Sequence, residues 1–221
     1  MKTSRLLAIV AVSTIAIASS MAAQTVIPIG EFQSVETRNG AHVLVRHGNT
    51  QRVSILTGDA RCASIRLADE QRLLIKKLHG CGRNQRLQIE IITPALSALA
   101  VSNGGTLQTV SAFPAIAEID AAVDNGGTLD IRSIRADAVH ASVEQGGRIL
   151  THPRSELMAA VVHGGSITYW GDVRVRKSVL HGGVVQRGTP ADVDKPLSDF
   201  GHSVRPPIAP VPPVAPVPPR S

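Results

Sequence analysis

Five glycine pairs recur at nearly constant spacing between residues 104 and 183, and they constrain the fold more than any other feature. The pairs are Gly104–Gly105, Gly126–Gly127, Gly146–Gly147, Gly164–Gly165 and Gly182–Gly183. Successive pairs are separated by 22, 20, 18 and 18 residues. A valine stands three residues before each pair, and Leu, Ile or Val stands two residues after it. The unit Val-x-x-Gly-Gly-x-(Leu/Ile/Val) therefore indicates an architecture of stacked copies.

Each unit contains two short runs of alternating apolar and polar residues, such as 99–101 and 106–109. Neither run can bury an apolar face alone, but stacked copies can share a continuous core. A unit of this length matches one coil of a β-solenoid, whereas a propeller blade needs about 40 residues. Glycine permits a positive φ or a close approach of the next coil, so we assign the glycine pairs to structural turns. The sequence predicts an all-β protein, a parallel β-helix or solenoid with coils of 18–22 residues.

The region before the first glycine pair also has strand-like patterns. Runs at 32–35 and 42–45 flank Asn39-Gly40, which suits a tight turn. Four more alternating runs follow before Pro94. We interpret them as less regular coils that cap the same solenoid, which gives one domain over residues 24–188.

The two cysteines, Cys62 and Cys81, enclose 18 residues that include two strand-like runs. Two cysteines in an exported chain favour a disulfide without a free thiol left over. A metal site is the alternative, but His79 is its only nearby partner. We therefore predict a structural disulfide.

The two termini differ in composition from the body. Residues 1–23 have a charged start at Lys2 and Arg5, an apolar stretch at 6–18 and small residues for cleavage near Ala22 or Ala23. This pattern is typical of a secretory signal peptide, so we expect a periplasmic or secreted protein whose mature chain has no transmembrane segment. Residues 206–219 contain eight prolines, so we predict a disordered, proline-rich tail over 189–221. The tail is either a spacer or a docking ligand for a proline-recognising partner or the cell wall.

Aromatic side chains are scarce, since the chain has only three Phe, one Trp and one Tyr. The core must therefore be aliphatic, and no set of stacking platforms for single-stranded nucleic acid is available. The formal net charge of +6 is spread without a run of Lys and Arg. We therefore expect no nucleic-acid partner.

Several motifs carry a resemblance to a known family. They are Glu31–Val35, Gly40–Val45, Leu73–Ile75, Ile91–Leu96 and the repeated Val-x-x-Gly-Gly units, in that order. Over residues 30–188 the chain resembles the head GIN domain family, which is described as autotransporter adhesins. The resemblance implies an exported, all-β, solenoid-like domain. It brings no catalytic residues to carry over.

The residues just before the glycine pairs should form a column across the stacked coils. The column consists of Asn103, Asn125, Gln145, His163 and His181. Stacked amides commonly stabilise such folds through side-chain hydrogen bonds. Alternatively, His163 and His181 are adjacent imidazoles that could hold Zn²⁺ or Cu²⁺, or respond to mildly acidic pH.

Two further residue pairs are candidate sites. Asp124 and Glu144 share a register position and could bind a cation or act as paired acids, whereas the other acids of the repeat fall at different positions. Tyr169 and Trp170 are adjacent aromatics, of which one could stack on a sugar ring or cover an edge of the solenoid. No catalytic triad, phosphate-binding loop or cofactor motif is present.

These features together predict an exported, non-catalytic protein of the cell envelope. We expect a binding or adhesion-like module that uses one face of the solenoid, with an envelope polysaccharide or protein as partner and no cofactor. The alternatives are an envelope enzyme that acts on polysaccharide and a structural periplasmic protein without a specific ligand. The sequence makes no prediction of the oligomeric state.

Overall fold

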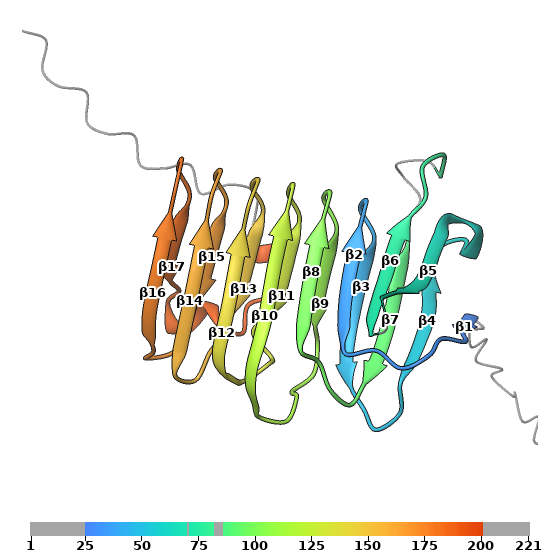
Figure 1. Ribbon diagram of the computed structural model, residues 1–221, viewed down its shortest axis with the longest axis horizontal. Coiled ribbons are helices and arrows are strands. Elements are labelled where there is room, and N and C mark those ends of the chain that lie inside the picture. Colours follow the sequence, from blue (N-terminus) through green and yellow to red (C-terminus); the bar gives the residue numbers. More distant parts are fainter. Residues whose placement is uncertain (1–24, 70, 82–85, 201–221) are drawn as a thin grey trace, which may run out of the picture.

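The computed structural model describes residues 25–69, 71–81 and 86–200 (Figure 1). The predicted signal peptide, its cleavage site and the proline run at 206–219 lie outside the described residues. In the described part of the chain, no helix has the length and apolarity that a membrane span requires.

The described residues form β-strands and three short 3-10 helices, so the prediction of an all-β protein is confirmed. The strands are β1 (Thr25–Ile27), β2 (Ser34–Arg38), β3 (His42–His47), β4 (Arg52–Thr57), β5 (Ala63–Ala68), β6 (Arg72–Lys77), β7 (Gln88–Thr93), β8 (Ala98–Ser102), β9 (Thr106–Thr109), β10 (Ile116–Asp124), β11 (Thr128–Ile131), β12 (Ala136–Val143), β13 (Arg148–Thr151), β14 (Glu156–Val161), β15 (Ser166–Tyr169), β16 (Arg174–Val179) and β17 (Val184–Arg187). The 3-10 helices are η1 (Ala60–Cys62), η2 (Pro190–Asp192) and η3 (Leu197–Asp199).

The strands lie in two facing mixed sheets (Figure 1). The nine-stranded sheet has the order β1-β4-β7-β3-β9-β11-β13-β15-β17, and the eight-stranded sheet has the order β16-β14-β12-β10-β8-β2-β6-β5. Pairing is parallel along most of both sheets and antiparallel where β1, β4 and β7 meet and where β5 meets β6. Beyond β8 each unit contributes one strand to each sheet, with the glycine pair between them.

Strand register follows the spacing of the glycine pairs. Val123 of β10 pairs with Val101 of β8 on one side and with Val143 of β12 on the other. Val161 of β14 and Val179 of β16 continue the series. The same residue of each unit therefore meets its counterpart in the next unit.

The two glycines of a pair have different roles. Gly126 has a φ of +79° with open space around its α-carbon, so it supplies a left-handed turn conformation. A β-carbon on Gly147 would lie 2.5 Å from Cγ1 of Val123 and 2.9 Å from the carbonyl oxygen of Gly127. Each Val-x-x-Gly-Gly motif thus couples two units, because the valine of one unit fills the space beside the second glycine of the next.

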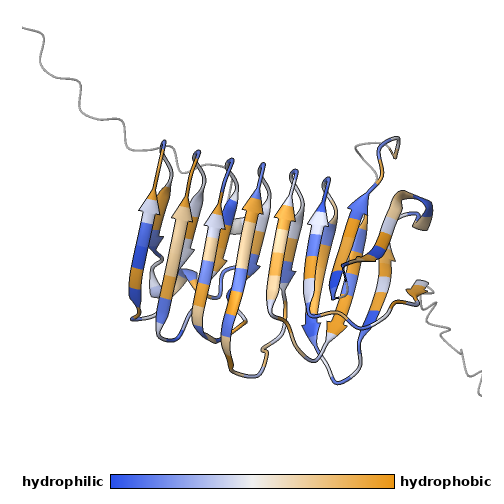
Figure 2. Ribbon diagram, viewed as in Figure 1, coloured by the Kyte–Doolittle hydropathy of each residue, from blue (hydrophilic) through white to orange (hydrophobic). Residues whose placement is uncertain are grey.

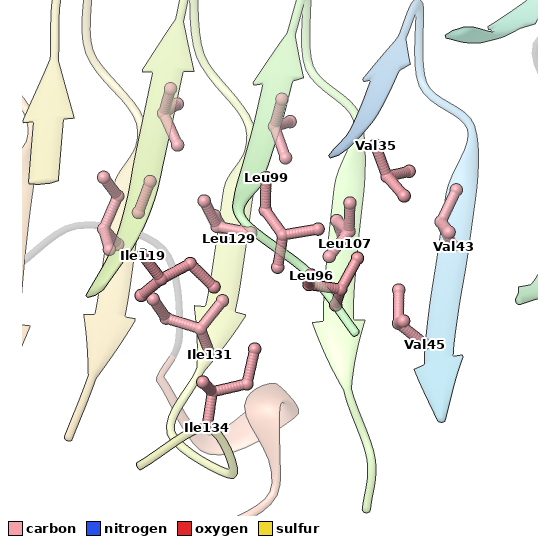
Figure 3. Close-up of a cluster of buried hydrophobic side chains, with 14 of the residues drawn as sticks. Val35, Val43, Val45, Leu96, Leu99, Leu107, Ile119, Leu129, Ile131 and Ile134 are labelled. Carbon is pink, nitrogen blue, oxygen red and sulfur yellow. The ribbon is translucent and has the colours of Figure 1, made fainter. Parts of the chain in front are cut away.

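The interior between the sheets is filled by aliphatic side chains. Leu99, Leu107, Ile119, Leu129 and Ile131 are all no more than 1% exposed and pack across the two sheets (Figure 3). Hydrophobic and hydrophilic residues alternate along the strands, as period-two side-chain geometry requires (Figure 2). The core is predominantly aliphatic and includes Phe32 and Phe113.

The two ends of the stacked units differ in structure. At the N-terminal end, antiparallel strands follow one another, and the predicted disulfide between Cys62 and Cys81 is confirmed, with Cα atoms 5.8 Å apart. At the other end, β16 and β17 are edge strands, and Val179, Leu180 and Val184 are 41%, 54% and 45% exposed. The edge strand β16 carries three exposed basic side chains, a common device against edge-to-edge aggregation.

Residues 189–200, which the sequence assigned to the tail, pack on the nine-stranded sheet. The indole Nε1 of Trp170 donates a hydrogen bond of 2.8 Å to the carbonyl oxygen of Thr189. The outward-facing residues Asp130, Leu150 and Thr168 are only 2%, 0% and 8% exposed. We attribute their burial to this segment, because Leu150 lies outside the cluster that fills the space between the sheets.

Candidate functional site

A column of small side chains runs across the outward face of the eight-stranded sheet. Parallel pairing places Ala100, Ala122, Ser142, Ala160 and Ser178 side by side on β8, β10, β12, β14 and β16. Alternate residues of a strand face the same side, so the next outward column lies two residues earlier. That column carries longer side chains: Asp120, His140, Met158 and Arg176.

The difference in side-chain length between the two columns creates a groove. It has a volume of about 640 Å³ and is lined by residues of β10, β12, β14 and β16. The small residues form its floor, and Asp120, His140, Met158 and Arg176 rise beside them. The groove therefore crosses the strands, in the direction in which the units are stacked.

Three donor groups meet at one end of this groove. His140 lies directly opposite Asp120, and Glu118 is two residues earlier on the same face of β10. The Nδ1 atom of His140 is 3.1 Å from Oε1 of Glu118 and 3.4 Å from Oδ1 of Asp120. The side chains of His140, Glu118 and Asp120 are 40%, 56% and 66% exposed, so this cluster is open to solvent.

Charge is distributed unevenly along the groove. The β10–β12 end is acidic, whereas Arg176 and Lys177 line the β16 end. Arg176 lies 3.4 Å from Oε1 of Glu156. The predicted neighbours Asp124 and Glu144 are also brought to adjacent strand ends, since the amide of Glu144 bonds the carbonyl of Val123. Both are exposed, and their side chains lie beyond the residues that line the groove.

The predicted column before the glycine pairs is partly an amide ladder. Asn125 Nδ2 donates to Asn103 Oδ1 at 2.7 Å, and Asn103 Nδ2 donates to Asn39 Oδ1 at 3.3 Å. His163 and His181 stack, with ring centroids 4.9 Å apart and planes inclined by 7°. Among the described residues, only Glu118, Asp120 and His140 form a group of three or more potential metal ligands, so the histidine pair has no third donor in reach.

Of the two interpretations of Trp170, the structure favours a covered side chain over a solvent-facing ring that stacks on a sugar. Trp170 is 3% exposed, because the chain after Gly188 turns back over it. The guanidinium of Arg132 lies 5.5 Å from the indole ring, and Phe200 contacts the ring edge-on at 5.9 Å. Tyr169 is partly buried against the core, so neither aromatic side chain presents an open face.

Sequence reasoning missed the cluster of Glu118, Asp120 and His140, although the signal was present. The offset between the glycine pairs at 126 and 146 also maps Asp120 onto His140. The repeat is visible by eye only near the glycine pairs, where identical residues recur. The same offset extended to the start of the strands places the histidine beside the carboxylates.

Comparison with known proteins yields structural neighbours only. No family model matches the sequence, and no curated protein matches it. A putative adhesin from Bacteroides fragilis has 15% identity and a TM-score of 0.47, over 75% of this chain and 96% of that chain. A putative adhesin from Parabacteroides distasonis has 14% identity and a TM-score of 0.43, over 75% and 96%. A putative lipid binding protein from the same species has 13% identity and a TM-score of 0.38, over 76% and 96%. Likeness at this level carries no argument about function.

Proposed function

We propose that this protein is an exported, non-catalytic β-solenoid that acts as an adhesion-like binding module. The ligand would lie in the groove on the outward face of the eight-stranded sheet. The observation that carries this proposal is the groove itself, which is formed by the same register positions of four successive units. Repeat proteins commonly use such extended faces to bind long partners.

The length of the groove and the polar side chains along its mainly apolar floor favour an elongated, hydroxyl-rich ligand. Four strands spaced about 4.8 Å apart give a floor roughly 14 Å long. Hydroxyl groups of Ser142 and Ser178 line it together with the polar side chains of Asp120, His140 and Arg176. Apart from the imidazole, no lining residue is aromatic, so recognition would rest on hydrogen bonds and charge and not on ring stacking. An envelope polysaccharide has this chemistry.

The remaining parts of the chain fit an envelope location. The signal-peptide pattern over 1–23 directs export, and the disulfide between Cys62 and Cys81 suits an oxidising compartment. In this proposal residues 24–188 form the binding domain, which resembles the head GIN domain family. The proline-rich run 206–219 would serve as a spacer that follows the packed segment 189–200.

A groove-filling substitution tests the proposal. Ser142→Tyr places a bulky ring on the groove floor, whereas Gln186→Tyr adds the same ring to an exposed outward position of β17 on the other sheet. Both variants of residues 24–221 are compared with the wild type for binding to solubilised envelope polysaccharide by biolayer interferometry. Thermal unfolding serves as the folding control.

We expect Ser142→Tyr to weaken binding by about tenfold or more, equivalent to about 1.4 kcal/mol. Gln186→Tyr should bind as the wild type does. If both variants bind equally, or if the wild type binds no envelope polysaccharide, this function is refuted.

A further inference from the structure

The cluster at the end of the groove combines one imidazole and two carboxylates from adjacent strands. Glu118 and Asp120 project from the same face of β10, and His140 projects from β12 directly across from Asp120. One oxygen of each carboxylate and a ring nitrogen of the histidine all lie within 4.8 Å of one another. Three different side chains therefore bring one potential ligand atom each into the same small region.

The distances are compatible with metal ligation as well as with an ion pair. Charge-assisted N–H···O bonds are typically about 2.7–2.9 Å long, and the imidazole nitrogen is 3.1 Å and 3.4 Å from its two carboxylate oxygens. Two ligands on a tetrahedral ion with bonds of about 2.0–2.1 Å are separated by about 3.4 Å. The two nitrogen–oxygen separations, 3.1 Å and 3.4 Å, are close to this value.

We propose that Glu118, Asp120 and His140 form a Zn²⁺ site. An imidazole with two carboxylates is a donor set that suits zinc, whereas Ca²⁺ and Mg²⁺ prefer all-oxygen sites. The imidazole must bind as the neutral form through Nδ1, the atom that faces both carboxylates. Three protein ligands leave one tetrahedral position open, and the exposure of the cluster makes that position accessible.

Strand pairing places this set of three ligands in only one pair of neighbouring units. On the β14 side of His140 stands Met158, and on the β8 side of Asp120 stands Ala98, neither of which supplies a carboxylate or an imidazole. The stacked rings of His163 and His181 supply only two ligands, and no third donor among the described residues joins them. The inference does not depend on the groove binding a polymer.

The test uses untagged, metal-free protein of residues 24–221 with Zn²⁺ alone as the titrant in isothermal calorimetry. Co²⁺ is added in a parallel experiment, since its absorption spectrum reports coordination number. His140→Ala and Asp120→Asn remove one ligand each at an exposed position. The double variant His163→Ala/His181→Ala is the matched control, because it removes two histidines that lie outside the cluster.

The wild type is expected to bind one Zn²⁺ per chain, with a four-coordinate Co²⁺ spectrum. Loss of an outer-shell partner typically weakens metal binding 10–100-fold, so loss of a ligand should weaken it by about 100-fold. The control should bind as the wild type does. The assignment is overturned if the wild type binds no Zn²⁺, if His140→Ala binds as tightly as the wild type, or if only the control loses binding. Circular dichroism on each variant establishes that it is folded.

Discussion

Arg132 makes several buried polar contacts, so its removal should strongly destabilise the fold. Its guanidinium forms a salt bridge of 2.7 Å with Asp130, and the two side chains are only 9% and 3% exposed. It also donates hydrogen bonds to the carbonyl oxygens of Asp192 and Val193, at 3.3 Å and 2.8 Å. The same group lies 4.8 Å from the ring of Phe200. One side chain therefore neutralises a buried acid and fastens residues 189–200 to the sheet.

The substitution Arg132→Ala should lower the free energy of unfolding by about 3–5 kcal/mol. The magnitude follows from burial, because without Arg132 the carboxylate of Asp130 is either left uncompensated inside the protein or exposed to water by loss of the packing of residues 189–200. With a urea m-value of about 2 kcal/mol/M, the midpoint should fall by about 2 M. The segment 189–200 should also detach, which exposes the bonds after Leu197 and Phe200 to chymotrypsin.

Arg46→Ala is the matched control, since Arg46 and Glu90 form a salt bridge of the same length, 2.7 Å, at a site more open to solvent. The side chain of Arg46 is 47% exposed, so its removal should cost no more than about 1 kcal/mol. Urea unfolding followed by circular dichroism measures both variants, and limited chymotrypsin digestion reports on the segment. An equal loss of stability in the two variants, or unchanged cleavage after Leu197 and Phe200 in Arg132→Ala, would refute the reasoning.

Three further predictions concern the turns, the disulfide and pH. Gly147→Ala should destabilise the protein by about 2–4 kcal/mol in urea unfolding. The new methyl group would overlap Val123 of the preceding unit, and the φ of +96° at Gly147 disfavours any residue with a β-carbon. Wild-type stability in this variant would show that the turn can rearrange. Cys62→Ser/Cys81→Ser should lower stability by about 3 kcal/mol, as expected for a bridge between residues 19 apart, and the unreduced wild type is the reference. Burial, with a contribution from Arg135, lowers the pKa of His152. The folded state therefore binds fewer protons than the unfolded chain, so stability should fall as the pH drops through about 6.5, and His152→Gln should show a shallower fall in thermal melts at pH 5.5 and 7.5.

The repeat made much of the fold predictable. The distance between glycine pairs gives the register directly, and the structure pairs Val101 with Val123 as that distance requires. The amide column was predictable for the same reason, and the hydrogen bond between Asn103 and Asn125 confirms it. Such features are local or strictly periodic, so one residue determines where its counterpart lies.

Features without a period were not predictable from the sequence. The sequence around Asp130 and Arg132 does not indicate that residues 189–200 cover these two side chains. Trp170 is an example. Alternation along β15 correctly predicts that Trp170 points outward, but it does not predict that residues 189–200 cover this outward face. Likewise, the contact between His140 and Glu118 depends on side-chain conformations on two strands, which a repeat pattern does not specify.

Because β16 and β17 form an exposed edge, further units could be added to this end of the molecule during evolution. Glu156 pairs with Ala138 and Arg174 pairs with Glu156, so the last units superpose at one constant offset along the chain. Duplication of one such stretch of coding sequence would add a unit that presents the same edge again, without changing the interior behind it. Each duplication would lengthen the outward face by about 4.8 Å. The length of the outward face can therefore increase in whole units, whereas the disulfide-bonded end of the protein stays unchanged.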